Sequence, residues 1–191
     1  LGHTHVEVIL TVKSAKREIT GKELLQHKDL HEAAIFEELR SWAVKFKVMT
    51  IADKQDGMNV MTSRYVTTWK EVDGKWIIKD RLTLRGFQDW FRHLHETYAG
   101  TASRMSQRWI SSECACHQHE PEPWIIATLD VNQAFLQGMS YAEIHERTGE
   151  PMREVYFSLP PGSSHILRKI PGWEQFDERR HVLRCTAPGT G

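Results

Sequence analysis

The chain has 191 residues, of which 40% are hydrophobic and 26% are charged, as is typical of a globular protein that can bury a core. Its 25 Lys and Arg residues balance its 25 Asp and Glu residues, which excludes a basic coat over the whole surface and leaves only a local basic face for nucleic acid. The longest apolar run, Trp124–Leu129, is far shorter than the ~20 residues that span a bilayer. Three cysteines do not make a disulfide framework, so we expect an intracellular protein, cytoplasmic or nuclear, without a membrane partner.

The first part of the chain is expected to contain a linker over residues 1–20, then a helix and a loop over residues 21–60. Thr20 and Glu23 fit a capping box, in which each side chain bonds a backbone amide of the first helical turn. Four apolar residues recur at helical spacing after it: Ile35, Leu39, Trp42 and Phe46. This stripe predicts a helix that packs one face against the rest of the protein, and residues 50–61 are predicted to be a loop.

A β-hairpin is predicted over residues 64–87, because two segments rich in β-branched and aromatic residues flank the turn signal Asp73-Gly74. Successive side chains of a strand point to opposite faces. One face of the second strand holds Lys75, Ile77, Lys79, Arg81, Thr83 and Arg85, and the other holds Trp76, Ile78, Asp80, Leu82 and Leu84. Residues 64–104 carry eight Lys or Arg against five Asp or Glu, a local charge of +3. The pattern therefore predicts a hairpin with one basic face and one mostly apolar face.

A second helix is expected over residues 101–116, with Thr101 or Ser103 as its cap and Met105 and Trp109 pointing inward. The apolar run that follows it predicts a buried central strand that ends at Asp130. A further strand is expected over Arg153–Leu159, and residues 163–191 are poorly patterned.

Asp130 allows two interpretations. An Asp directly after a strand often starts a turn or caps the next helix. A carboxylate at the end of a buried strand can also be a ligand of a hard cation such as magnesium, whose charge offsets the cost of desolvation.

A ten-residue segment begins at the end of this predicted strand: Leu129-Asp130-Val131-Asn132-Gln133-Ala134-Phe135-Leu136-Gln137-Gly138. It resembles the first catalytic motif of reverse transcriptases from copia-type retrotransposons. The predicted hairpin, with Lys79-Asp80-Arg81-Leu82 and Gly86-Phe87, resembles the fingers of the same family, and Val155–Gly162 resembles the strand and Pro turn that follow. The resemblance covers roughly residues 64–162 in order.

The resemblance implies an α+β fold, a fragment of a right-hand polymerase with a fingers hairpin over 64–87 and an incomplete palm sheet. Residues 61–191 would be a partial reverse transcriptase domain, with its first catalytic motif over 124–138. The implied activity is RNA-directed DNA polymerase, a nucleotidyltransferase that adds deoxynucleoside triphosphates to a DNA primer on an RNA template. The implied parent is a Pol polyprotein, whose other parts would also be partners.

The resemblance also implies roles for individual residues. Asp130 and the backbone of Val131 would hold magnesium, as part of a site in which two ions about 3.5–4 Å apart stabilise the reacting oxygens. Lys79 and Arg81 would bind the triphosphate of the incoming nucleotide. Gln133 would lie beside the sugar, and the ring of Phe135 would exclude a ribose 2′-hydroxyl.

The second catalytic motif of that family, Tyr-x-Asp-Asp, is missing, because the chain contains no Asp-Asp pair. We therefore expect a fragment truncated before this motif and inactive on its own. The alternative is a catalytically inactive retrotransposon remnant that acts at most as a nucleic-acid-binding or interaction module. A third interpretation is a zinc-dependent binding module built on Cys114-Ala115-Cys116-His117-Gln118-His119. Consecutive ligands close a tetrahedron poorly, so the spacing does not favour zinc.

Overall fold

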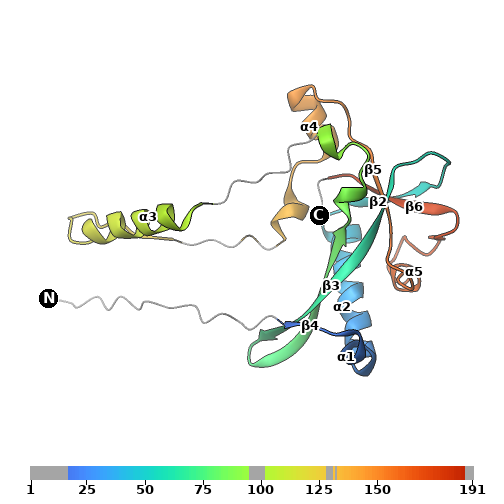
Figure 1. Ribbon diagram of the computed structural model, residues 1–191, viewed down its shortest axis with the longest axis horizontal. Helices are drawn as coiled ribbons and strands as arrows, with labels where there is room; N and C mark the ends of the chain where they lie inside the picture. Colours follow the sequence, from blue (N-terminus) through green and yellow to red (C-terminus); the bar gives the residue numbers. More distant parts are fainter. Residues whose placement is uncertain (1–16, 95–101, 128–130, 132, 188–191) are drawn as a thin grey trace. The chain divides into compact units, whose positions relative to one another are not determined.

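The computed structural model describes residues 17–94, 102–127, 131 and 133–187 of the chain. These residues form an α+β fold, which is the coarse part of the prediction (Figure 1). The chain divides into two compact units. The larger unit contains residues 1–89 and 135–191, and the smaller unit contains residues 90–134.

In the described residues of the larger unit, six strands form the sheet: β1 (Arg17–Glu18), β2 (Met49–Asp53), β3 (Val60–Val72), β4 (Lys75–Leu84), β5 (Val155–Ser158) and β6 (His181–Cys185). Their order in the sheet is β1-β3-β5-β6-β2, and β3 also pairs with β4, which is not part of this series. The sheet is mixed, because β3 and β5 are parallel while the other neighbours are antiparallel. The long β3 therefore serves both the central sheet and the hairpin with β4.

The predicted hairpin is confirmed in position and register. β3 and β4 pair from Ser63 opposite Leu84 to Val72 opposite Lys75. The turn residues Asp73 and Gly74 both have positive φ, at 50° and 73°, as a two-residue hairpin turn requires. The alternation of faces is confirmed too, since Ile78, Asp80, Leu82 and Leu84 are buried whereas Lys75, Lys79 and Arg81 are exposed.

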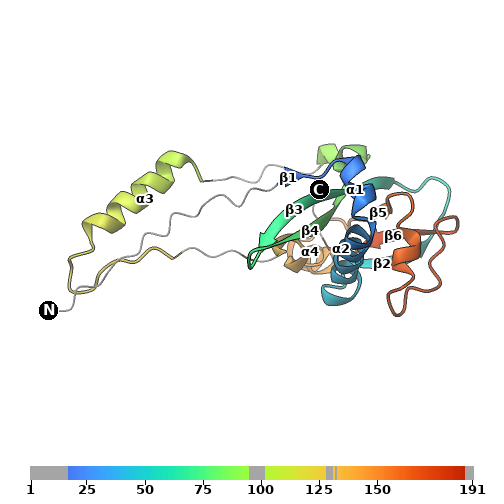
Figure 2. The same cartoon turned by 90° about the horizontal axis from the view of Figure 1, so that it is seen from below.

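The helical elements are α1 (Gly21–Gln26), α2 (Lys28–Arg40), the π-helical turn η1 (Ser41–Lys45), η2 (Gly86–Gln88), η3 (Arg92–Leu94), α3 (Arg104–Cys116), η4 (Ala134–Gln137), α4 (Tyr141–Thr148) and α5 (Ser164–Leu167). The predicted capping box is present, and the carboxylate of Glu23 accepts hydrogen bonds from the amide and hydroxyl of Thr20. Both views place α2 against the β3–β4 hairpin (Figure 1, Figure 2). No helix of the described residues is long and apolar enough to cross a membrane.

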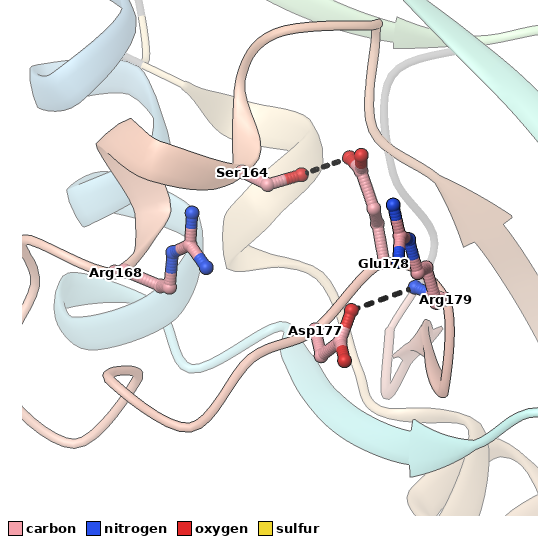
Figure 3. Close-up of a pocket in the computed structure, with 5 residues that line it drawn as sticks. All are labelled: Ser164, Arg168, Asp177, Glu178 and Arg179. Carbon is pink, nitrogen blue, oxygen red and sulfur yellow. Dashed lines mark hydrogen bonds between the residues drawn. The ribbon is translucent and has the colours of Figure 1, made fainter.

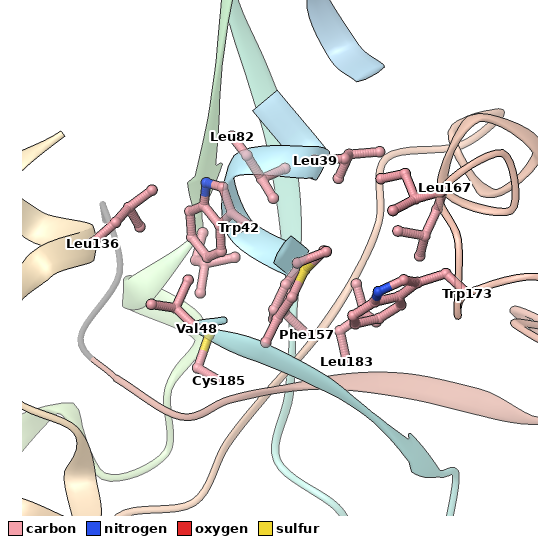
Figure 4. Packing of buried hydrophobic residues seen from close by; sticks show 14 of the residues in the cluster. Leu39, Trp42, Val48, Leu82, Leu136, Phe157, Leu167, Trp173, Leu183 and Cys185 are labelled. Atoms are coloured by element: carbon pink, nitrogen blue, oxygen red, sulfur yellow. The ribbon is translucent and has the colours of Figure 1, made fainter. Parts of the chain in front are cut away.

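The core lies between α2, the sheet and the segment around α5 (Figure 4). Leu39 and Trp42 from the predicted helical stripe are fully buried, and Trp42 meets Phe157 of β5 edge to face with centroids 6.0 Å apart. Burying large side chains of this kind contributes about 1.5–3 kcal/mol each. The core is completed by Leu82 of β4 and Leu183 of β6.

Three parts of the larger unit differ from the sequence-based expectation. The loop predicted over residues 50–61 contains β2 and the start of β3, and only the segment between them is a loop. Arg17 and Glu18, expected in a linker, pair with β3 opposite Trp69 and Thr68. Residues 163–191, whose sequence is poorly patterned, contribute α5, β6 and a set of buried side chains: Ile166, Leu167, Ile170, Trp173 and Phe176.

The smaller unit confirms a helix and corrects a strand. α3 begins after Ser103, whose hydroxyl accepts a hydrogen bond from the amide of Ser106 at 3.1 Å. Met105 and Trp109 do not point into a core, because their exposed fractions are 74% and 69%. The described part of the predicted buried strand, residues 124–127, is exposed and forms no strand. An apolar run becomes a buried strand only where neighbouring strands pair with it, and no described strand does so here.

Candidate nucleic-acid interface

The outer face of the β3–β4 hairpin is basic. Alternation along the two strands places Arg64, Val66, Thr68, Lys70 and Val72 of β3 on one face with Lys75, Ile77, Lys79, Arg81 and Thr83 of β4. None of these β3 and β4 residues is acidic, and five of them carry a positive charge. We call this surface the basic face.

The two nucleotide-binding residues predicted on this strand lie together at the centre of the basic face. Lys79 and Arg81 line a shallow hollow of about 130 Å³ with Lys70, Val66 and Thr68. Both side chains are exposed, so phosphate oxygens can reach them from solvent. Arg offers a planar fork of donors and Lys a point charge, and both suit phosphate groups.

The opposite face of β4 is apolar except at Asp80, whose side chain is fully buried. The hydroxyl of Thr67 donates a hydrogen bond to Oδ1 of Asp80, and Nε2 of His31 lies 3.5 Å from the same oxygen. Among the described residues, Oδ2 of Asp80 and Nε2 of His31 have no hydrogen-bond partner. Burial raises the pKa of Asp80, the Thr67 hydrogen bond and His31 lower it, and Glu38 raises it.

A second buried carboxylate, Glu38, links α2 to β4. Its Oε1 accepts hydrogen bonds from the backbone amide of Leu82 at 3.0 Å and from the indole of Trp42 at 3.1 Å. Because β4 pairs only with β3 among the described strands, this contact covers part of the outer edge of β4. The position of Glu38 beside the apolar stripe of α2 is the sequence signal that could have revealed this buried group.

The other predicted site residues follow the end of the predicted strand. Asp130 lies outside the described residues, so its predicted role as a magnesium ligand stays a prediction. Val131 is exposed, and Gln133 is half-buried with a positive φ of 54°. The structure describes the backbone of Phe135 within η4 but not its side chain. Val131 and Gln133 belong to the smaller unit, so a joint site with Lys79 stays a prediction.

The Cys and His residues at the end of α3 make local contacts. The thiol of Cys114 donates to the carbonyl of Trp124 at 3.3 Å. His117 stacks on the Trp124 ring with centroids 4.5 Å apart, and its Nδ1 lies 2.6 Å from the carboxylate of Glu120. In the described part of the chain, no group of three or more His, Cys, Asp or Glu residues lies close enough together to hold a metal ion.

A second hollow, of about 290 Å³, lies beside α5 (Figure 3). Two arginines, Arg168 and Arg179, and two acids, Asp177 and Glu178, line it. Ser164 donates a hydrogen bond to Glu178, and Asp177 accepts one from the amide of Arg179 at 3.0 Å (Figure 3). Because its charges balance, this hollow favours a polyanion less than the basic face does.

Comparisons of the chain with protein-family models, with curated proteins and with solved structures find no match.

Proposed function

We propose that this chain is part of an RNA-directed DNA polymerase of the copia type, and that its basic face binds the phosphates of nucleic acid or of an incoming nucleotide. The observation that carries the proposal is the convergence of Lys70, Lys79 and Arg81 on one exposed hollow. The sequence resemblance over residues 64–162 supports the same reaction class. Asp130 and magnesium would supply the chemistry of nucleotidyl transfer.

The positive charges of the basic face would supply affinity for nucleic acid. Cations that contact phosphates release condensed counterions, so binding weakens steeply with salt and depends little on sequence. Such binding requires a cluster of positive charges. The basic face supplies one, because its β3 and β4 residues include five Lys or Arg and no Asp or Glu, although the formal charge of the whole chain is zero. Template, primer and triphosphate all present such phosphates.

A second candidate function is a nucleic-acid-binding module without catalysis. The observation in its favour is that the 191 residues contain no Asp-Asp pair, which the second catalytic motif of the resembled family needs. The gene sequence after Gly191 separates the two candidates. A Tyr-x-Asp-Asp motif within about a hundred residues supports the polymerase, and a stop codon supports the module.

The binding experiment compares two double variants. Lys79→Gln/Arg81→Gln removes two charges from the basic face, and Lys54→Gln/Arg180→Gln removes two exposed charges beside β2, the strand at the other edge of the sheet. Fluorescence anisotropy with a labelled primer–template, repeated over a salt series, measures affinity and its salt slope. We expect the first variant to lose at least about tenfold in affinity. The slope of the logarithm of the association constant against the logarithm of the salt concentration should become shallower by between about one and two units, because each lost phosphate contact reduces it by roughly 0.7–0.9. Equal losses in both variants would refute the interface.

Primer extension with magnesium tests catalysis. We expect the 191-residue chain alone not to extend a primer, because Asp130 by itself cannot hold two metal ions. Incorporation above that of an Asp130→Asn variant would contradict this expectation.

A further inference from the structure

A buried acid lies directly behind the basic face. Asp80 stands between Lys79 and Arg81 in β4, and its side chain points to the opposite side of the strand. Lys79 and Arg81 are exposed, whereas the side chain of Asp80 is fully buried. One strand thus separates a buried carboxylate from two cations that face solvent.

The surroundings of Asp80 compensate its charge only in part. The titratable groups that face it are His31 and Glu38 from α2 and Tyr65 from β3, and Thr67 of β3 donates its hydroxyl hydrogen bond. His31 lies 3.5 Å away and Glu38 adds a second carboxylate, while Oδ2 of Asp80 has no hydrogen-bond partner among the described residues. A buried charge with incomplete pairing favours the protonated acid.

We propose that buried Asp80, with His31 beside it, is a proton-uptake site, which couples the protonation of the hairpin to anion binding on the basic face. This inference rests on the proposed function, because it needs phosphate to bind at Lys79 and Arg81. The ligand is the phosphate backbone of a single-stranded nucleic acid. Asp80 acts as a residue that sets affinity and touches no ligand itself.

The coupling follows from the field of the cations. In the proposed coupling, the positive charges of Lys79 and Arg81 favour the carboxylate form of Asp80 across one strand before binding. A bound phosphate neutralises these cations and so favours a proton on Asp80. Conversely, a proton on Asp80 removes a negative charge behind the face and strengthens the binding of the phosphate.

The test uses the full chain and an oligodeoxynucleotide without a terminal phosphate. Titration calorimetry at pH 7 in buffers of different ionisation enthalpy gives the number of protons taken up on binding. We expect uptake by the wild-type chain and less uptake by Asp80→Asn. At pH 7.5 and low salt, Asp80→Asn should bind roughly three- to tenfold more tightly than wild type, because one charge behind the face is gone. Its affinity should also fall less between pH 6 and pH 8.

Glu71→Gln is the matched control, because Glu71 belongs to the same hairpin but is exposed. Solvent screens its charge, so we expect less than about a twofold change in affinity and wild-type proton uptake. His31→Gln is the second variant, for the case that Asp80→Asn fails to fold by circular dichroism. It should also lower the uptake, because Asp80 loses a neighbour that lies 3.5 Å away and favours its charged form. Proton uptake in Asp80→Asn and His31→Gln equal to that of wild type would overturn the inference and leave the interface intact. Absence of salt-dependent binding by the wild-type chain would overturn the proposed function itself.

Discussion

Replacing Glu38 by Ala tests whether α2 holds the outer edge of β4. The carboxylate accepts the amide of Leu82 at 3.0 Å and the indole of Trp42 at 3.1 Å, and only 8% of Glu38 is exposed. The variant takes the acceptor away from two donors in the protein interior. The indole of fully buried Trp42 cannot turn to solvent without opening the core.

The size of the effect follows from these two donors. Each buried donor that loses its acceptor costs about 1–3 kcal/mol, so Glu38→Ala should lower the free energy of unfolding by about 2–6 kcal/mol. Glu38→Gln keeps a side-chain oxygen for both donors and should cost about 1 kcal/mol, mainly from the loss of charge-assisted bonding. The neighbouring Glu37 is the control, since its exposed carboxylate lies 3.7 Å from Arg40 and such surface pairs contribute about 0–1 kcal/mol.

Urea denaturation followed by circular dichroism at pH 7 measures these differences. The order of unfolding free energies should be Glu37→Ala close to wild type, then Glu38→Gln, then Glu38→Ala. A double-mutant cycle with Trp42→Phe isolates the indole contact, because both changes together remove donor and acceptor. A stabilising role of the Glu38 contacts would be refuted if Glu38→Ala costs no more than Glu37→Ala, or if the cycle shows no coupling between Glu38 and Trp42.

Three further predictions concern other buried groups. Burial raises the pKa of Asp80, so between the ordinary carboxyl pKa and the raised value the folded state binds more protons than the unfolded state. The stability of wild type therefore falls as pH rises through this window. In thermal melts from pH 4 to pH 8, the melting temperature of Asp80→Asn relative to that of wild type should rise with pH. Asp89 lies 2.5 Å from Arg153, and because Asp89→Ala leaves this partly buried guanidinium without its carboxylate, urea denaturation should show a loss of about 3 kcal/mol. Burial raises the pKa of the Cys185 thiol to about 12, so a chromogenic disulfide reagent at pH 8 should modify exposed Cys116 quickly and Cys185 only after unfolding.

The hairpin could be predicted because all its information is local. Its strands have a period of two, and Asp73-Gly74 supplies the positive φ values that the turn needs. The stripe on α2 is equally local, since helical spacing alone places Leu39 and Trp42 on one side. The basic face followed from the same alternation, and its two central residues, Lys79 and Arg81, were identified correctly as neighbours on one surface.

The strands β2 and β6 could not be predicted from local pattern, because each depends on a distant partner. Met49 pairs with Cys185, at the other end of the sequence, and Asp53 pairs with His181. The segment before β6 changes direction repeatedly, so single apolar residues reach the core from successive turns without a helical or strand period. Its fully buried Ile170 is one example, directly before Pro171. Burial at such positions is decided by tertiary packing.

The opposite error occurred at the apolar run before Asp130. Hydrophobicity favours burial, but the described residues 124–127 have no strand neighbours and are exposed. The buried carboxylates were missed for a related reason. An Asp or Glu in a strand or helix is usually solvated. The place of Glu38 beside the apolar stripe is a weak signal of burial, and contacts from another element, such as His31 to Asp80 and Leu82 to Glu38, show which acid is buried.

The proposed coupling at Asp80 can be measured in two ways, as proton uptake in calorimetry and as the pH dependence of affinity in anisotropy titrations. By linkage, a plot of the logarithm of the association constant against pH has a slope equal to minus the number of protons taken up on binding. The uptake that Asp80→Asn removes in calorimetry must therefore equal the part of the pH slope that the same variant removes in the anisotropy titration. The other histidines of the chain contribute equally to wild type and variant, so they cancel in this difference. A merely distorted hairpin would change affinity by the same factor at every pH, and it would leave both the proton uptake and the pH slope as in wild type. A joint decrease of proton uptake and pH slope in Asp80→Asn therefore indicates an electrostatic role of Asp80, whereas a change of affinity with both quantities unchanged indicates a merely structural one.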